Sequence, residues 1–203
     1  VHVANNCYDS LADDPERDVF KMPEWILGLV KAKNLGRKTG AGFYKKVGKD
    51  IQVYDVATGA YREQKKVRFD SIGAVREVED PGARLKKFVA QQDKAAKFGW
   101  AALAHTLCYS SKLVGEISDD LVQIDNAMKW GYNWDMGPFE AWDAIGVKDS
   151  VARMQAEGIQ VPKVVMDMLE SGRESFYGGP LSDRDFYDVT AKKAAKLPKD
   201  PKN

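Results

Sequence analysis

Apolar residues recur with helical spacing along most of the chain, and this pattern predicts a mainly α-helical protein. Residues 1–22 are polar and acidic, and the first helical pattern begins at Pro23, a residue that suits the first turn of a helix. A second pattern runs from Asp80 to about Gly115 and predicts one long helix with Asp80 as its N-cap. Its second half is apolar around much of its circumference, so we expect neighbouring elements to cover it on several sides.

Shorter helices are predicted after the long one. Ser118 would cap the first of them, and Gly131 would end it. A helix from about residue 148 to residue 157 follows, Gly158 breaks the pattern, and the last helix restarts at Pro162.

The most distinctive stretch is residues 123–147. It holds three of the five tryptophans, Trp130, Trp134 and Trp142, between two runs with helical spacing, and Pro138 suits the first turn of the second run. Bulky apolar residues at this density predict a helix-loop-helix corner that lies in the core.

Residues 50–66 show the alternation of a β-hairpin instead. Apolar residues from Ile51 to Tyr54 precede a turn that ends at Gly59, and Tyr61 follows it. Two isolated strands must pack against helices to be stable. The predicted fold class is therefore mainly α, a helical bundle with one short β-hairpin.

Composition narrows the function classes. Hydrophobic residues make up 44% and charged residues 30%, which is typical of a soluble globular protein, and the net charge of +1 argues against a dedicated nucleic-acid binder. There is no apolar run of about 18 residues that would cross a membrane. Cys7 and Cys108 lie far apart, which favours a reducing compartment over a disulfide or zinc framework, and we expect a cytoplasmic location.

The glycine-rich, basic segment 36–44, with the sequence GRKTGAGFY, does not fit a phosphate-binding loop. No window matches G-x-x-x-x-G-K-[ST], and the G-x-G at Gly40 and Gly42 lacks a third glycine. The segment also follows a predicted helix and precedes strands, which is the reverse of the required order. We interpret it as a helix end that leads into a sharp turn.

One pair of acidic residues has a spacing that could suggest a catalytic role. Glu140 and Asp143 lie three residues apart on one predicted helix face, where exposure or helix capping is the usual role, and nothing nearby in the sequence indicates a raised pKa. A glycosidase-like pair is therefore not favoured.

Two pieces of the chain match each other, residues 23–44 and residues 162–177. Each runs from a proline through an apolar helix to a Gly-Arg pair and then a Phe-Tyr pair. The separation between equivalent residues falls from 139 at the prolines to 136 at the Gly-Arg pairs and 133 at the Phe-Tyr pairs. We interpret this as one helical unit used twice, with the second piece shorter by three residues in two places.

Two motifs resemble those of the C-terminal helical domain of the NAD-dependent 3-hydroxyacyl-CoA dehydrogenases. The first reads Ala127, Met128, Gly131, then Met136, Gly137, Pro138, Phe139, Glu140, then Asp143 and Gly146. The second reads Gly36, Arg37, Lys38, Thr39, Gly40, Gly42, Phe43 and Tyr44. The family often has proline just before Met-Gly-Pro, where this chain has Asp135, so the loop that enters the corner is expected to be shaped differently.

The resemblance and the repeat together predict four segments. Residues 1–48 would be the tail of a first helical C-terminal domain, residues 49–79 the β-hairpin and a linker, residues 80–180 a complete second domain, and residues 181–203 a linker or tail. The chain opens with valine and shows no signal sequence, so we expect a piece of a longer protein. The second domain would then stand in for the domain of a partner subunit.

The resemblance implies the C-terminal portion of an NAD-dependent 3-hydroxyacyl-CoA dehydrogenase of fatty-acid β-oxidation, forming the acyl-side wall and a pseudo-dimer interface. In the family, NAD and the catalytic His-Glu pair belong to a Rossmann domain, so no catalytic, cofactor-binding or metal-binding residue is assigned here. The implied partners are acyl-CoA, an upstream Rossmann domain and, in some relatives, a fused enoyl-CoA hydratase domain. A homodimer and a non-catalytic helical assembly module are the alternatives left open.

Arg37 and Lys38 are the candidate substrate-binding residues. With Lys45 and Lys46 they form a basic group that could meet the phosphates of CoA. Solvated basic side chains beside a turn are the alternative interpretation.

Overall fold

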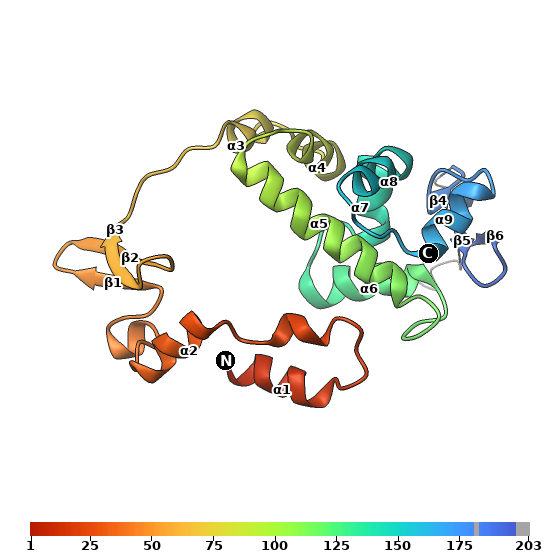
Figure 1. Ribbon diagram of the computed structural model, residues 1–203. Helices are drawn as coiled ribbons and strands as arrows, with labels where there is room; N and C mark the ends of the chain where they lie inside the picture. The colour runs from red at the N-terminus through yellow and green to blue at the C-terminus, as the bar shows by residue number, and fades with distance from the viewer. Residues whose placement is uncertain (181–182, 198–203) are drawn as a thin grey trace. The chain divides into compact units, whose positions relative to one another are not determined.

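The computed structural model describes residues 1–180 and 183–197, and the chain divides into two compact units. Unit 1 comprises residues 1–67 and unit 2 residues 68–203. In Figure 1 the elements of unit 1 are coloured red to orange and those of unit 2 from ochre to blue. Within the described ranges, no helix combines the length and the apolar character that a membrane crossing requires.

Unit 1 joins short helices to an antiparallel three-stranded sheet ordered β1-β2-β3. Its elements are α1 (His2–Ser10), η1 (Arg17–Phe20), α2 (Glu24–Lys31), η2 (Arg37–Thr39), β1 (Tyr44–Val47), β2 (Asp50–Asp55) and β3 (Ala60–Glu63), where η marks a 3-10 helix. The helix predicted after Pro23 and the predicted hairpin are confirmed as α2 and β2-β3. Strand β1 is an addition to that hairpin.

Unit 2 is a helical bundle with a second antiparallel sheet, ordered β4-β5-β6. Its elements are α3 (Asp70–Val75), α4 (Pro81–Val89), α5 (Lys94–Lys112), α6 (Leu121–Tyr132), α7 (Pro138–Ile145), α8 (Val147–Ala156), α9 (Lys163–Glu170), β4 (Tyr177–Gly178), β5 (Asp185–Asp188) and β6 (Lys193–Lys196). The predicted fold class, mainly α with a short hairpin, is confirmed. The second sheet extends past residue 180, where the sequence pattern places a linker or tail.

The single long helix predicted after Asp80 is wrong, because the chain forms two helices there, α4 and α5. Asp93 caps α5 by accepting a hydrogen bond from the Ala96 amide at 3.0 Å. The same carboxylate accepts bonds from the amide and the hydroxyl of Ser71, both at 2.9 Å. An aspartate that bonds nearby backbone amides competes with helix continuation, and apolar periodicity alone does not reveal that competition.

Both ends of α6 also differ from the prediction. Its N-cap is Asp120 rather than Ser118, and the Asp120 carboxylate accepts a hydrogen bond from the Gln123 amide at 2.9 Å. The helix continues through Gly131 and ends at Asn133, which has φ of 56°. Asparagine tolerates this left-handed conformation better than most residues, so a glycine is not needed to end the helix.

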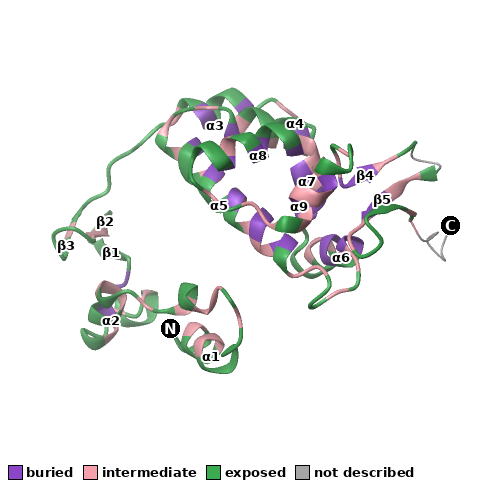
Figure 2. Ribbon diagram, turned by 45° about the vertical axis from the view of Figure 1, so that its right-hand side comes forward, coloured by how far each residue is buried: buried purple, intermediate pink, exposed green. Residues whose placement is uncertain are grey.

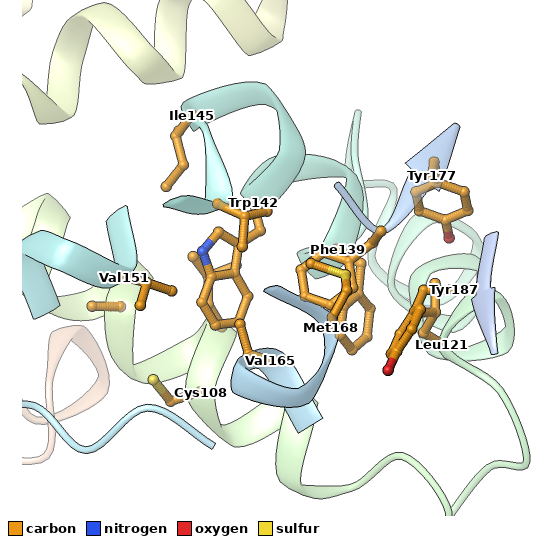
Figure 3. Packing of buried hydrophobic residues seen from close by; sticks show 14 of the residues in the cluster. Cys108, Leu121, Phe139, Trp142, Ile145, Val151, Val165, Met168, Tyr177 and Tyr187 are labelled. Carbon is orange, nitrogen blue, oxygen red and sulfur yellow. The ribbon is translucent and has the colours of Figure 1, made fainter. Parts of the chain in front are cut away.

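The core of unit 2 lies between α5, α6, α7, α8, α9 and the second sheet. Buried residues, purple in Figure 2, recur along these helices, and Figure 3 shows Trp142, Phe139 and Met168 within the cluster. Trp142 is fully buried, but Trp130 and Trp134 are 78% and 43% exposed. The prediction that all three tryptophans lie in the core is therefore wrong for two of them.

The direction of Trp130 on its helix explains this error. Its side chain shares a face of α6 with Gln123, Ala127 and Gly131, and all four positions are exposed. The density of tryptophans in a sequence does not specify which face of a helix each one occupies.

The two sheets pair their first two strands in the same way, at positions 133 residues apart. Tyr44 pairs with Val53 as Tyr177 pairs with Phe186. The next residue of the second strand donates a backbone hydrogen bond in both sheets. The Tyr54 amide donates to the Phe43 carbonyl at 2.8 Å, and the Tyr187 amide donates to the Phe176 carbonyl at 2.7 Å. The hairpin turns that follow have positive φ at positions that are also 133 residues apart, Gly59 and Lys192.

The helix ends before the two sheets correspond at a separation of 139. Lys33 after α2 has φ of 60° and Gly172 after α9 has φ of 85°. Gly36 lies beyond the helix end, so the two Gly-Arg pairs are not equivalent, contrary to the sequence interpretation. The second piece is therefore shorter by six residues in one place, between the helix end and the sheet.

Candidate functional site

Asp125 on α6 lies two residues before the first motif and binds residues within it. Its side chain is fully buried and accepts hydrogen bonds from the amides of Phe139 and Glu140 at 2.8 and 3.1 Å. These are amides of the first turn of α7, which have no partner within their own helix. The Tyr177 hydroxyl donates to the same carboxylate at 2.7 Å. Asp125 therefore joins α6, α7 and β4 at one point.

Gly137 is required by the close approach of α7 to α6. A Cβ at this position would lie less than 3.0 Å from the Cα, Cβ and Oδ1 atoms of Asp125. Glu140 completes the corner, because its carboxylate accepts from the Gly137 amide at 3.0 Å and pairs with Lys129 at 2.8 Å. The Met-Gly-Pro-Phe-Glu sequence thus builds a capped helix start against a buried carboxylate.

Asp143, one turn further along α7, holds the closing segment of the unit. Its two carboxylate oxygens accept from the amides of Phe176 and Tyr177 at 2.7 and 2.8 Å. The predicted capping role of Glu140 is confirmed, whereas Asp143 is a partner of backbone amides 33 and 34 residues away.

Burial sets the proton affinity of these carboxyl groups. Removal from water raises the pKa of Asp125 to about 6, and the Phe139 amide and the Tyr177 hydroxyl oppose this rise by stabilising the charged form. Burial likewise raises the pKa of Asp143 to about 6, against the amides of Tyr177 and Phe176. The sequence interpretation that nothing near Asp143 raises its pKa is wrong. The pKa of Tyr177 is also raised, by burial first and then by the Asp125 charge.

Raised pKa values in a cleft often mark catalytic acids, but the geometry here indicates a different role. Each carboxylate is bonded to groups that are fixed in the fold, and Asp125 is enclosed by the elements that it joins. The two carboxylates can therefore hold α6, α7 and the second sheet together. Their contacts indicate a structural role and no part in a chemical reaction.

The closing segment is fixed on its other side by Arg173. Its guanidinium donates to the carbonyls of Ser175 and Phe176 at 2.8 and 3.2 Å and pairs with Asp185 on β5 at 2.5 Å. The Phe176 ring then packs in the core, 4.9 Å from the Phe139 ring between centroids. Arg173 therefore connects the end of α9 to the second sheet.

An apolar groove of about 590 Å³ lies beside this corner in unit 2. Its walls come from α4, α5 and the loop before α7, and they include Leu85, Phe88, Leu103, Trp134 and Met136. Its polar contributors include Arg84 and Asp135, whose charged groups lie 3.9 Å apart. Most of the surface that the groove presents is hydrocarbon.

The basic loop of unit 1 brings together some of the candidate substrate-binding residues. Arg37 and Lys46 line a hollow of about 880 Å³ together with Phe43 and Tyr44. Lys38 is exposed and is not part of that lining. Lys45 lies over the Tyr61 ring, with its Nζ 5.4 Å from the ring centroid. The four basic residues are therefore not aimed at one point.

Asp125 and Asp143, with the groups that they bind, form a structural brace, and this role was not predicted from the sequence, although Asp143 belongs to the first motif. Asp125 follows Leu121 by four residues and so shares its buried helix face, and a charged residue on such a face is the signal that could have found it. Asp143 gives no comparable signal, because its partners are far along the chain. In residues 1–180 and 183–197, no cluster of three or more His, Cys, Asp or Glu side chains forms a metal site.

Two proteins are similar in sequence to the chain. "Probable 3-hydroxyacyl-CoA dehydrogenase" of Bacillus subtilis is 38% identical over 196 residues, 97% of this chain and 25% of that protein. "Putative fatty acid oxidation complex trifunctional enzyme" of Rickettsia felis is 27% identical over 136 residues, 64% of this chain and 17% of that protein. The chain thus spans a quarter or less of the length of these relatives. No protein-family model and no solved structure matches it.

These similarities confirm the predicted resemblance to the 3-hydroxyacyl-CoA dehydrogenases. The match to the Bacillus subtilis protein extends over almost the whole chain, so both motifs and both sheets lie in a region of shared sequence.

Proposed function

We propose that the chain is the C-terminal portion of an NAD-dependent 3-hydroxyacyl-CoA dehydrogenase of fatty-acid β-oxidation. The observation that carries this proposal is the set of hydrogen bonds around Asp125, in which this carboxylate holds the motif residues Phe139 and Glu140 and the hydroxyl of Tyr177. The named relatives support the same assignment. NAD and the reacting groups would be supplied by a Rossmann domain outside these residues. A fused enoyl-CoA hydratase domain would suit the trifunctional enzyme of Rickettsia felis.

Within that enzyme, the chain would contribute a supporting wall. The groove beside Trp134 is largely apolar, and such a surface suits either an acyl chain or the apolar face of a neighbouring domain. The brace fixes the loop before α7, which forms one side of the groove, so the groove would keep its shape while substrate binds and leaves.

The two units would be a helical domain used twice, the first present only as its tail. Support comes from the matching strand pairings at a separation of 133 and the matching helix ends at a separation of 139. One chain would then hold both copies of the domain, whereas a dimer holds one in each subunit.

A longer protein that contains these residues tests the activity. It should oxidise 3-hydroxyacyl-CoA with reduction of NAD, followed by absorbance at the wavelength of the reduced cofactor, whereas the 203-residue chain alone should not. A matched variant of the longer protein with Gly137→Ala should lose activity together with stability. Absence of activity in the correctly folded longer protein would refute the assignment.

A helical assembly module without chemistry is the second candidate, because the residues of the brace are structural. The coding sequence upstream of Val1 distinguishes the two. A G-x-G-x-x-G fingerprint after a predicted strand supports the dehydrogenase, and its absence supports the assembly module.

Direct binding of acyl-CoA by Arg37 and Lys38 is a separate part of the proposal. Calorimetry with acetoacetyl-CoA should give a heat of binding that is lost in the double variant Arg37→Ala and Lys38→Ala. Lys31→Ala with Lys33→Ala is the matched control, since it removes two positive charges outside the loop. An equal heat in both variants would remove these residues from the substrate site.

A further inference from the structure

The Phe-Tyr pairs of the two sheets have the same backbone pairing but opposite burial. In unit 2, Phe176 is fully buried and Tyr177 is 7% exposed. In unit 1, the corresponding Phe43 and Tyr44 are 51% and 59% exposed. Large aromatic side chains are usually buried when a core is available, so the exposed pair indicates a surface of unit 1 that another element could cover.

The elements that cover the pair in unit 2 are α6 and α7. Phe139 and Trp142 of α7 pack against the Phe176 ring, with centroids 4.9 and 5.5 Å apart. Asp143 of α7 bonds both backbone amides, and Asp125 of α6 bonds the tyrosine hydroxyl. The cover is therefore a helix pair that brings aromatic rings and two carboxylates.

Unit 1 presents the groups that such a cover would bind. Among the described residues, no side chain accepts a hydrogen bond from the amide of Phe43 or of Tyr44, and none bonds the Tyr44 hydroxyl. One edge of the Phe43 ring contacts Trp25, at 5.4 Å between centroids, and the other side opens on the hollow of about 880 Å³. Arg37 and Lys46 line this hollow and give it a positive charge that suits carboxylates.

We propose that this hollow is the docking site for a helix pair of the same kind as α6 and α7, supplied by the longer protein from outside residues 1–203. One carboxylate of the pair binds the amides of Phe43 and Tyr44, a second binds the Tyr44 hydroxyl, and aromatic side chains fill the hollow. The relatives leave ample length for such a pair, since this chain spans 25% of the Bacillus subtilis protein. The inference rests on the proposed function, because it takes unit 1 as the tail of a domain like unit 2.

Hydrogen exchange compares the 203-residue chain with the longer protein. Amides of the segment around Phe43 and Tyr44 should exchange on the order of tenfold more slowly, or slower still, in the longer protein, because the helix pair covers them there. The segment around Phe176 and Tyr177 is the internal control and should be protected in both. Equal exchange of the first segment in the two proteins would overturn the inference.

Protection already present in the 203-residue chain would also overturn it, since another part of this chain or a second copy would then be the cover. A dilution series distinguishes cover by the same chain from cover by a second copy. Only in the second case should the protection of the segment against hydrogen exchange decrease on dilution.

The variant Tyr44→Phe tests the second carboxylate. It should accelerate exchange of its own segment in the longer protein and leave that segment unchanged in the 203-residue chain. Tyr177→Phe is the matched control and should accelerate exchange of the second sheet in both proteins. No effect of Tyr44→Phe in the longer protein would refute the hydroxyl contact.

The dehydrogenase assay on the same samples keeps the two proposals apart. Activity without protection of the segment would leave the function standing and overturn the docking site. Protection without activity would support the docking site and argue against the dehydrogenase.

Discussion

The two Phe-Tyr pairs show how one local sequence can occupy two environments. Phe43-Tyr44 and Phe176-Tyr177 share their strand pairing and the hydrogen bond to the next strand, so local sequence determines the backbone geometry. Their burial differs because α6 and α7 cover the second pair within unit 2, whereas the elements of unit 1 leave more than half of each side chain of the first pair exposed. The first sheet has the same strand pairing as the second without such a cover, so the pairing does not depend on the carboxylates of α6 and α7.

The largest expected effect comes from truncating the two phenylalanines. Phe176→Ala should lower the free energy of unfolding by about 3–5 kcal/mol, because it leaves a cavity against Phe139 and Trp142. Phe43→Ala in the 203-residue chain should lower it by less than about 1 kcal/mol, since half of that side chain is exposed. Urea unfolding followed by circular dichroism measures both, and equal losses would mean that the first pair is covered as well.

Gly137→Ala tests the contact that shapes the cover. The added Cβ would meet the main chain of Asp125, which cannot rotate away, so we expect a loss of about 3 kcal/mol. Gly131→Ala on the neighbouring helix is the matched control, because its Cβ would meet no atom within 4 Å. There alanine should raise stability by a few tenths of a kcal/mol up to about 1 kcal/mol. Similar behaviour of the two variants would contradict the close packing of α7 on α6.

The buried carboxyl groups predict an unusual pH dependence. The pKa of Asp125 is about 6 in the folded protein and near its ordinary value of 3.8 in the unfolded chain. The folded state therefore binds more protons between these values, and stability should rise as the pH falls from 7 towards 4. The shift of about two pH units corresponds to roughly 3 kcal/mol over the full range.

Asp125→Asn should reduce the slope of this profile between pH 7 and pH 5 without removing it, because the pKa of Asp143 is raised to about 6 as well. Thermal unfolding at each pH measures the slope. Asp119→Asn, at an exposed position, is the matched control and should keep the slope. A wild-type protein that loses stability steadily on acidification from pH 7 to pH 5 would show that hydrogen bonds to the carboxylate outweigh its burial.

Much of the fold follows from local chemistry that the sequence displays. Pro23 and Pro138 lie at helix starts, and Gly59 lies in the hairpin turn, because each residue has a backbone preference of its own. The end of α4 and the start of α5 were missed because Asp93 bonds Ser71, 22 residues earlier in the chain. Such a contact has no periodic signal.

The sequence predicts where the candidate site lies, through its motif, but it does not predict which residues bond to one another there. The sequence displays the motif around Gly137, yet both partners of Asp143 and one partner of Asp125 come from β4 and the residue before it, up to 52 residues away. The second sheet was also missed, because the lysines of β6 are typical of an exposed tail. Its pairing with β5, which carries the buried Phe186, is a tertiary effect.

The smallest expected effect concerns Trp130, whose side chain is 78% exposed. In the 203-residue chain, Trp130→Ala should change the free energy of unfolding by less than about 0.5 kcal/mol, whereas Trp142→Ala should cost several kcal/mol in the same urea titration. A large loss for Trp130→Ala would restore the prediction that it belongs to the core. If the variant lowers the stability of the longer protein but not of this chain, then Trp130 contacts another domain, and the exposed face of α6 is a second surface that only the longer protein completes.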